Sequence, residues 1–417
     1  MKLLYIMQGT PATVQDGSYA RPYQVHPDAP DEFDAIFKKN RGANTFLLYP
    51  GDYQTRGCYA FPDTNLALID PNSCLIGMCG SQVTKITLAS GYVETNQSGQ
   101  PIKQAEALML GGLQQTGSER MIVGGFTLDV TAARHPTVAL HVVSSGAQVL
   151  DVRVKGLHGG INHPPEGTPR GEEGFGILVN DGPGTLGGGS KISDCSVEVI
   201  DVPDQYATGI YLGSLAVRRA PNAIHGCYAF STNSPGRLQS HAAFAANENT
   251  HISNCTASGF DRFVFCDTRD CGDLTITGCR GDFGYAAIDF TAKQTATNVS
   301  QYRRRIRIAD CILANDLPSP IQPPGQPHSI FIKIHDGPDP EDTHDVMLIA
   351  GIDVDGCIVT SNQPPGTLPQ GFYVCSIQGA LAEKIWIRNS MFPAGARTTE
   401  GVYSPTIPGS VVFEMLR

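Results

Sequence analysis

The sequence predicts an all-β protein that winds as a parallel β-helix, with about ten coils of three short strands each. Three observations support this fold class. One short phrase recurs along the chain, its copies are separated by intervals of variable length, and the residues between them alternate like β-strands without a long helical pattern. A constant strand phrase with variable insertions is typical of a solenoid, in which each repeat packs on the next.

The recurring phrase has a fixed pattern. Two β-branched or apolar residues stand two positions apart, and a small polar residue, a cysteine and a second alternating run follow. Successive cysteines are 24 to 46 residues apart. The copies are SKISDCSVEVI (190–200), NAIHGCYAFST (222–232), THISNCTASGF (250–260), DLTITGCRGDF (273–283), RIRIADCILAN (305–315) and GIDVDGCIVTS (351–361), with QVLDVRVKG (148–156) and KIWIRNSMF (384–392) as copies that lack the cysteine.

Three strands can be marked within one coil. After Cys255 they are TASGF, then FVFCD, then LTITGC, with short turns between them. The first strand of each coil is predicted at 106–110, 139–143, 176–181, 209–213, 243–248, 263–267, 287–293, 330–336 and 372–376.

We expect the whole chain, 1–417, to form a single domain. In this domain 1–60 supply an N-terminal cap and the first coil, and 61–415 supply the coils. DEFDAIFKKN (31–40) predicts a short capping helix with Asp31 as its N-cap, and TFLLYPGDYQTRG (45–57) predicts the first strands. The longest insertions are predicted at 157–173, 291–305, 317–328 and 337–351.

The composition excludes several function classes. A net charge of −10 disfavours nucleic-acid backbones, which need a basic face. No run approaches the roughly 18 apolar residues of a membrane helix, so we expect no membrane partner. The apolar run at the start of the sequence, MKLLYIMQGT, is shorter than the apolar segment of a signal peptide. We therefore expect a chain that is cytoplasmic or exported by a route that needs no such leader.

Six cysteines occupy one position of the repeat, and this placement indicates packing. Equivalent residues of stacked coils lie ~4.8 Å apart, so these side chains would form an inward column. Parallel Cβ vectors disfavour disulfides at that spacing, and we expect free, buried thiols. The six are Cys195, Cys227, Cys255, Cys279, Cys311 and Cys357.

The pattern I-x-(D/N/G)-C-x-hydrophobic resembles the repeat of the pectate-lyase-like superfamily of single-stranded, right-handed parallel β-helices. The resemblance covers roughly 105–415, and it implies a right-handed coil without implying one activity. Members of that superfamily often stack Asn where this chain has Cys. The NTD, GDD, GHG and RIK motifs of polygalacturonases are absent, as is the acidic calcium motif of pectate lyases.

A charged patch is predicted on the outer face of the first sheet, formed by Glu248, Asp267, Asp289, Lys333 and His335. Neighbouring coils would place equivalent residues ~5 Å apart and second neighbours ~10 Å. Two carboxylates ~5–5.5 Å apart suit a retaining glycosidase, and roughly 6.5–9.5 Å suits an inverting one. Such carboxylates also shift each other's pKa values apart, which gives an acid and a base. These five residues are the predicted catalytic residues of a carbohydrate-active enzyme.

Strand alternation decides which side chains face outward. It predicts that Phe263 and Phe265 point into the core, and that Tyr211, Val264, Cys266, Asp289, Phe331, Lys333 and His335 point away from it. Substrate contacts are expected from aromatic rings that stack on sugars and from polar residues beside them. These residues are Arg269, Tyr211, Tyr285, Phe331, Asn247, His163, Glu166, Arg170 and Glu173.

Three other functions stay open beside glycosidic-bond hydrolysis or transfer. A polysaccharide lyase would use Lys333, His335 or Arg269 for β-elimination. A non-catalytic glycan-binding adhesin or phage-fibre-like protein would use the same face only for binding, and an intracellular isomerase or cyclase would use it for a small molecule. AFAANENTHISNC and FCDTRDCGDLTITGC resemble inulin fructotransferases, which implies an Asp/Glu pair for glycosyl transfer.

The expected partner is an oligo- or polysaccharide, and a homo-oligomer stays open. We expect no metal or other cofactor. HDGPDPEDTHD (335–345) has enough oxygens for Ca²⁺, but its spacing matches no EF-hand, and a solvated loop is the prediction.

Overall fold

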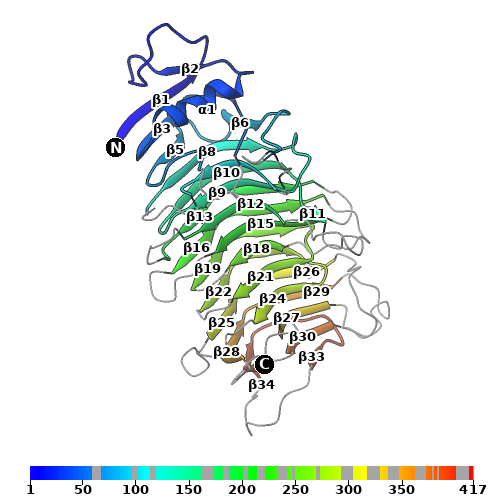
Figure 1. The fold of residues 1–417 in the computed structure, drawn as a ribbon. Coiled ribbons are helices and arrows are strands. Elements are labelled where there is room, and N and C mark those ends of the chain that lie inside the picture. The colour runs from blue at the N-terminus through cyan, green and yellow to red at the C-terminus, as the bar shows by residue number, and fades with distance from the viewer. Residues whose placement is uncertain are drawn as a thin grey trace. The chain divides into compact units, whose positions relative to one another are not determined.

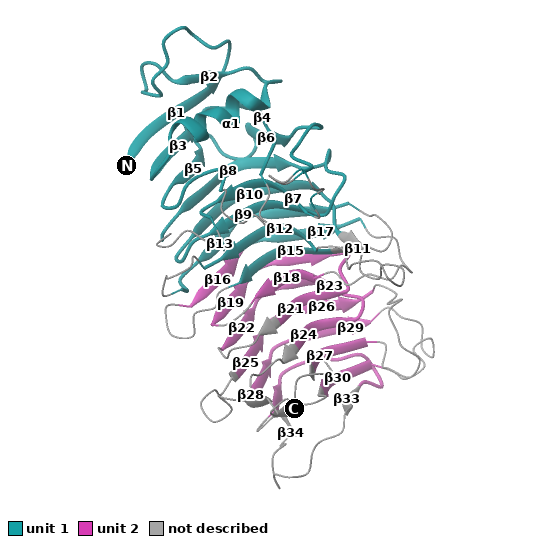
Figure 2. Ribbon diagram, viewed as in Figure 1, with its two compact units in different colours: residues 1–219, 227–232 teal, residues 220–226, 233–417 magenta. Residues whose placement is uncertain are grey.

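The computed structural model describes residues 1–58, 67–95, 99, 102, 104–112, 119–161, 173–181, 187–200, 205–213, 221–232, 242–246, 249–268, 273–292, 304–316, 329–336, 347–361, 372–377, 380–382, 385–400 and 413–416. The chain divides into two compact units (Figure 2). Unit 1 is formed by 1–219 and 227–232, and unit 2 by 220–226 and 233–417.

The described residues of unit 1 form one helix and strands that stack coil upon coil in parallel, except for β11, which pairs antiparallel with β15 (Figure 1). Its elements are β1 (Lys2–Gln8), β2 (Tyr23–Val25), α1 (Pro30–Lys39), β3 (Asn44–Leu48), β4 (Gly51–Thr55), β5 (Cys74–Gly77), β6 (Thr84–Leu88), β7 (Ala105–Leu110), β8 (Ile122–Asp129), β9 (Thr137–Val143), β10 (Gln148–Leu157), β11 (Gly160–Ile161), β12 (Gly174–Asn180), β13 (Lys191–Ser193), β14 (Ser196–Val199), β15 (Gln205–Gly213) and β17 (Tyr228–Ser231).

Unit 2 continues the pattern with strands alone among its described residues. They are β16 (Asn222–His225), β18 (Ala242–Ala246), β19 (Thr250–Ser253), β20 (Thr256–Ser258), β21 (Arg262–Thr268), β22 (Leu274–Thr277), β23 (Arg280–Asp282), β24 (Ala286–Ala292), β25 (Arg304–Ala309), β26 (Ile312–Asn315), β27 (Ser329–Asp336), β28 (Met347–Asp355), β29 (Ile358–Ser361), β30 (Phe372–Ile377), β31 (Ala380–Ala382), β32 (Ile385–Arg388), β33 (Arg397–Glu400) and β34 (Phe413–Leu416).

The predicted β-helix is confirmed in both units. A typical coil runs through β21, β22 and β23, and each of these strands pairs in parallel with its equivalent in the next coil, β24, β25 and β26. The first strands form a sheet of their own, β7-β9-β12-β15 in unit 1 and β18-β21-β24-β27-β30-β33 in unit 2. All nine predicted first strands lie in this sheet.

The N-terminal cap contains the predicted helix, but its start is different. The N-cap is Ala29, with Pro30 in the first turn, so the prediction of Asp31 as N-cap was wrong. Asp31 instead pairs with Arg56, with 2.7 Å between the Arg56 Nε and the carboxylate. The helix buries Phe33 and Phe37, and the ring of Phe37 packs edge-on against Phe46 at a centroid distance of 4.9 Å.

The small polar residue of the repeat has a conformational cause. In each copy the residue before the cysteine adopts a left-handed backbone, with φ of 55° at Asp194, 52° at Asn254 and 56° at Asp310. Glycine takes the position at Gly226, Gly278 and Gly356. Asn, Asp and Gly are the residues that tolerate this region, and the tight bend separates the second strand from the third.

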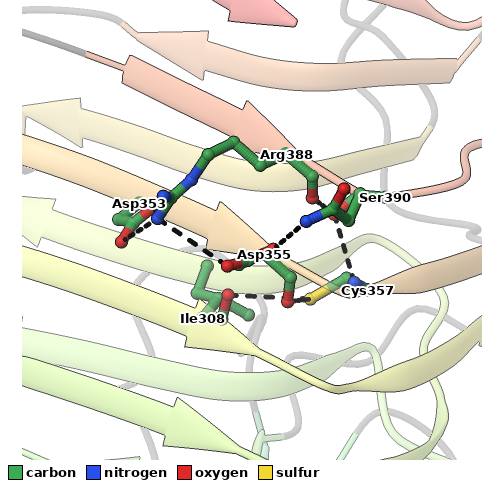
Figure 3. Close-up of polar contacts among 7 residues, drawn as sticks. Ile308, Asp353, Asp355, Cys357, Arg388 and Ser390 are labelled. Atoms are coloured by element: carbon green, nitrogen blue, oxygen red, sulfur yellow. Dashed lines mark hydrogen bonds and ion pairs between the residues drawn. The ribbon is translucent and has the colours of Figure 1, made fainter. Parts of the chain in front are cut away.

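The cysteine column is confirmed as free and buried in both units. Each thiol contacts a main-chain carbonyl of the preceding coil, as Cys255 does with Ile224 at 3.6 Å in unit 2. Figure 3 shows Cys357 with its sulfur 3.7 Å from the Ile308 carbonyl oxygen, below the ion pair of Arg388 with Asp353. A small, weakly polar side chain therefore fits where the backbone turns.

Two predicted insertions are shorter than expected. Strand β24 extends to Ala292 and β25 begins at Arg304, which takes residues from both ends of 291–305. Strand β28 begins at Met347, within the predicted 337–351. The remainder of these insertions, residues 317–328 and most of 157–173 lie outside the described residues.

Candidate functional site

The described part of the candidate site lies on the outer face of the first sheet in unit 2. Phe265, Asp289 and Lys333 occupy equivalent positions of β21, β24 and β27, so their backbones are in direct register. Two residues further along each strand, Asp267, Thr291 and His335 form a second row in register. The sheet therefore places Asp289 beside Lys333, and the backbone of Asp267 one coil from Thr291.

Asp289 is fully buried and paired with a cation from the preceding coil. The Nε of Arg262 donates to Oδ2 of Asp289 at 2.5 Å, and the Arg262 side chain is 16% exposed. The guanidinium also lies over two rings, with its central carbon 5.5 Å from the centroids of both Phe265 and Tyr285. One carboxylate and two aromatic faces thus fix the orientation of this arginine.

Lys333 is held by the same tyrosine. Its ammonium donates to the Tyr285 hydroxyl and lies 4.6 Å from the centroid of that ring. Lys333 is 9% exposed, and burial lowers the pKa of its amine, while the nearby Asp289 carboxylate acts in the opposite direction. We name Arg262, Phe265, Tyr285, Asp289 and Lys333 the cationic cluster.

A second carboxyl adjoins this cluster. Asp261 precedes Arg262 in the chain and is 6% exposed. Burial raises the pKa of Asp261 to about 7, against the opposing effect of the Arg262 charge. Its Oδ2 has no hydrogen-bond partner among the described residues. The charge of this region therefore changes near neutral pH.

The structure corrects the predicted orientation of strand 263–267. Val264 and Cys266 are 0% and 1% exposed, whereas Phe265 is partly exposed and lies in register with Asp289. The prediction placed Phe265 inward and its two neighbours outward, and was wrong for all three. Phe263 is buried as predicted, so the correction applies to Val264, Phe265 and Cys266.

Three further residues that were predicted to face outward, Phe331, Asp289 and Lys333, are buried. Phe331 is fully buried, and its ring packs edge-on against Phe392 at 5.4 Å. Ile330 and Ile332 on either side of Phe331 are buried as well, so burial does not alternate along this part of β27. Asp289 lies on the predicted face but is buried.

Several predicted site residues lie outside the described residues. These are Glu248, Asn247, Arg269, His163, Glu166 and Arg170. For Asp267 and His335 the structure gives the backbone register alone. Their roles, like those of Asp289 and Lys333 in catalysis, stay predictions.

Unit 1 carries a related arrangement on its own part of the first sheet. Phe175 of β12 stacks on Tyr211 of β15, with ring centroids 5.7 Å apart, and both rings are partly exposed. In the same unit, Glu106 of β7 pairs with His141 of β9 at 3.1 Å, and both side chains are buried. Glu173, a predicted contact residue, accepts a hydrogen bond from the Thr208 hydroxyl.

The Phe175–Tyr211 and Glu106–His141 contacts share one geometry with the Arg262–Asp289 pair in unit 2. In each of these contacts, the first residue touches a residue of the next coil. That second residue lies three positions further along its strand than the register partner of the first. Thr208 is in register with Phe175 and stands three residues before Tyr211. Ala286 is likewise in register with Arg262 and stands three residues before Asp289. The same diagonal contact therefore recurs between successive coils, with different pairs of side chains at each place.

The comparisons with solved structures address the fold. The tailspike protein of E. coli bacteriophage HK620 in complex with a pentasaccharide has a TM-score of 0.62 and 12% identity, and covers 95% of this chain and 63% of the tailspike chain. A tailspike mutant in complex with a hexasaccharide gives 0.60 and 12%, with the same coverage. Another mutant gives 0.56 and 12%, and covers 95% of this chain and 65% of that chain.

The chain has the right-handed parallel β-helix fold seen in these tailspike structures. This β-helix spans 63% to 65% of the length of those tailspike chains. No family model matches the sequence, and no curated protein matches it.

Sequence reasoning missed two contacts that the β-helix forms. One joins Arg262 and Phe265 in unit 2, and the other joins Glu106 and His141 in unit 1. Arg262 stands just before the predicted strand 263–267, although it begins β21 in the structure. The signal that identifies Arg262 is its position three residues before Phe265, which shares a register row with Asp289 and Lys333. Among the described residues, no three His, Cys, Asp or Glu side chains gather as metal ligands do, and no helix is long and apolar enough to cross a membrane.

Proposed function

We propose that this β-helix binds an oligo- or polysaccharide across the outer face of its first sheet in unit 2 and cleaves a glycosidic bond there. The observation that carries the proposal is the cationic cluster. It combines a partly exposed ring at Phe265, a fixed guanidinium at Arg262 and an amine at Lys333 on one rigid sheet.

Sugar recognition needs apolar faces for the ring and charged or polar groups for the hydroxyls. Aromatic rings supply the first, and preorganised donors supply the second at small cost in conformational entropy. Arg262 is held by Asp289 and two rings, so it does not have to be ordered when a ligand binds. The tailspike structures with bound oligosaccharides, which share this fold, support a glycan as the ligand.

For bond cleavage we propose Asp267 and Glu248 as the carboxylates, with His335 and Lys333 assisting. Asp289 is better suited to orienting Arg262 than to exchanging protons with a substrate, because it is fully buried and its Oδ2 already accepts from that arginine. The backbone of Asp267 lies two residues further along its strand than the register row of Phe265 and Asp289, and strand alternation is the reason for proposing its carboxylate beside the cationic cluster.

The test is a screen of neutral and acidic polysaccharides, with products identified by mass spectrometry. Hydrolysis adds water to the products, elimination leaves an unsaturated sugar that absorbs in the ultraviolet, and transfer gives anhydro or lengthened products. We expect cleavage of at least one glycan, and loss of turnover with retained binding in Asp267→Asn. Failure of every glycan to bind would overturn the proposal.

A second candidate is glycan binding without turnover. It is favoured by one observation: the only carboxylate within the cationic cluster, that of Asp289, is buried and ion-paired. Binding of a glycan by the wild-type chain that persists for days with no change in the glycan's mass would select this function.

A further inference from the structure

We propose that the glycan recognised at the cationic cluster carries an anionic substituent, a carboxylate in the first instance, and that Lys333 and Arg262 bind it. The inference rests on the proposed function and names the substrate class of the same site. It holds for cleavage and for binding alone.

The first argument is a count of charge. The cationic cluster contains two cations, Arg262 and Lys333, and one carboxylate, Asp289, which leaves one positive charge in excess (2 − 1 = 1). The chain as a whole carries a net charge of −10. While Asp261 is protonated, the described side chains of the cationic cluster therefore carry a net positive charge within an acidic protein, and this favours an anion.

The second argument is the state of Lys333. This amine is 9% exposed, and no carboxylate of the described residues lies within ion-pair distance of it. Its contacts are the hydroxyl and the ring face of Tyr285. Burying an ammonium is costly unless it is paired, and a neutral phenol with a cation–π contact offsets only part of that cost. A ligand carboxylate would complete the pairing.

The third argument concerns where the ligand would enter. Arg262 and Phe265 are the partly exposed members of the cationic cluster. A sugar ring stacked on Phe265 would bring a ring substituent towards the guanidinium and, one coil further along the register, towards Lys333. Adjacent coils are ~4.8 Å apart, which is within the span of one monosaccharide and its carboxylate.

Asp261 sets the conditions of the test. Ionisation of this carboxyl would cancel the excess charge, and its pKa of about 7 makes it largely neutral at pH 6. Measurements are therefore made at about pH 6 and at low ionic strength, where screening is weakest.

The experiment uses the full chain and matched pairs of probes. Oligogalacturonate, hyaluronan and alginate fragments are each compared with their carboxyl-reduced counterparts by calorimetric titration, together with a panel of neutral glycans. We expect at least one carboxylated probe to bind about tenfold to a hundredfold more tightly than its reduced form, as a charge-assisted contact provides. Raising the salt concentration to about 0.3 M should lower the ratio of the two affinities.

Two variants assign the effect to the cluster. Lys333→Met should remove the preference for the carboxylated probe, so that the carboxylated and reduced probes bind with similar affinity. Arg280→Met makes the same change in charge at an exposed position of β23 in the same unit, and should leave the preference intact. If Lys333→Met does not fold, the wild-type ratio and its salt dependence still decide the matter.

The outcomes separate the two proposals. Equal affinity for each carboxylated and reduced pair, or binding of neutral glycans alone, would overturn the anionic substrate and leave the proposed function standing. Absence of binding to any glycan would overturn the proposed function itself. A preference that survives in Lys333→Met but is lost in Arg280→Met would place the anion site on another face.

Discussion

At the scale of single residues, the outer face of the first sheet depends on buried charges held by specific partners. Asp289 is the clearest case, since its carboxylate is 0% exposed and accepts a hydrogen bond from Arg262 at 2.5 Å. A buried ion pair adds little net stability against an apolar pair of similar volume, but loss of one partner leaves a charge without compensation. This asymmetry can be measured.

We expect Asp289→Asn to lower the free energy of unfolding by about 3 kcal/mol, because the arginine then keeps its charge in a largely buried position. Urea unfolding followed by circular dichroism measures the change. The double variant with Arg262→Met and Asp289→Leu is the control, and it should recover most of the loss. A single variant as stable as the wild type would show that this pair is not held as described.

Two buried carboxyls should make stability depend on pH. Burial raises the pKa of Asp34 to about 6 and that of Asp261 to about 7, against about 4 in an unfolded chain. A raised pKa means that the folded state binds the proton more tightly. The resulting stabilisation is complete below about pH 4 and is lost as the pH rises through 6 and 7.

We therefore expect these two groups to lower the Tm by about 5 °C or more between pH 5 and pH 8. Thermal unfolding in matched buffers measures this. Asp261→Asn cannot titrate, so its Tm should fall less over the same interval than that of the wild type. An identical decrease in both proteins would exclude Asp261 as a cause.

At the scale of elements, the repeat phrase could be predicted in detail because each of its positions has a local physical reason. The alternating pair gives the second strand, Asn254 or its equivalent gives the bend, and the cysteine fills the space inside it. The first strands were located correctly but not always oriented correctly. The segment 263–267 contains apolar residues at four successive positions, so alternation alone does not choose a face.

The left-handed backbone at the bend favours particular residue types. Asn254 has φ of 52°, a region in which a residue with a Cβ and no local polar group is strained. We expect Asn254→Ala to cost about 1 kcal/mol of unfolding free energy and Asn254→Gly to cost much less. Thr256→Ala, at an exposed position of β20, is the control and should be nearly neutral.

Gly278 tests the same bend one coil later. A Cβ there would lie 2.6 Å from the Asn254 Oδ1, in addition to the strain of a φ of 63°. Gly278→Ala should therefore destabilise more than Asn254→Ala in the same urea titration. The reverse order would show that the stacked Asn side chain does not constrain its neighbour.

At the scale of the whole molecule, the fold follows from the sequence more completely than the site does. A repeat is visible as a pattern, because every coil must satisfy the same packing. The cationic cluster has no such pattern. Arg262 reaches Asp289 across a coil boundary, over 27 residues of sequence, and Lys333 meets Tyr285 over 48 residues. Contacts of this kind depend on the register of the coils, which a sequence repeat locates only to within a residue or two.

The division into two units raises the question of cooperativity. The repeat phrase runs from 190–200 through 222–232 to 250–260 without a change in pattern, although the unit boundary falls within this stretch. We therefore propose that the chain is one domain, and expect one unfolding transition.

The chain's single tryptophan, Trp386, reports on unit 2, and a dye on Cys79, an exposed thiol, reports on unit 1. Cys58→Ser and Cys271→Ser in the background keep the labelling specific, because the other described thiols apart from Cys79 are buried. Coincident urea midpoints from the two probes would support one domain, as solenoid coils coupled to their neighbours unfold together. Two separated midpoints would instead show that the two units unfold independently.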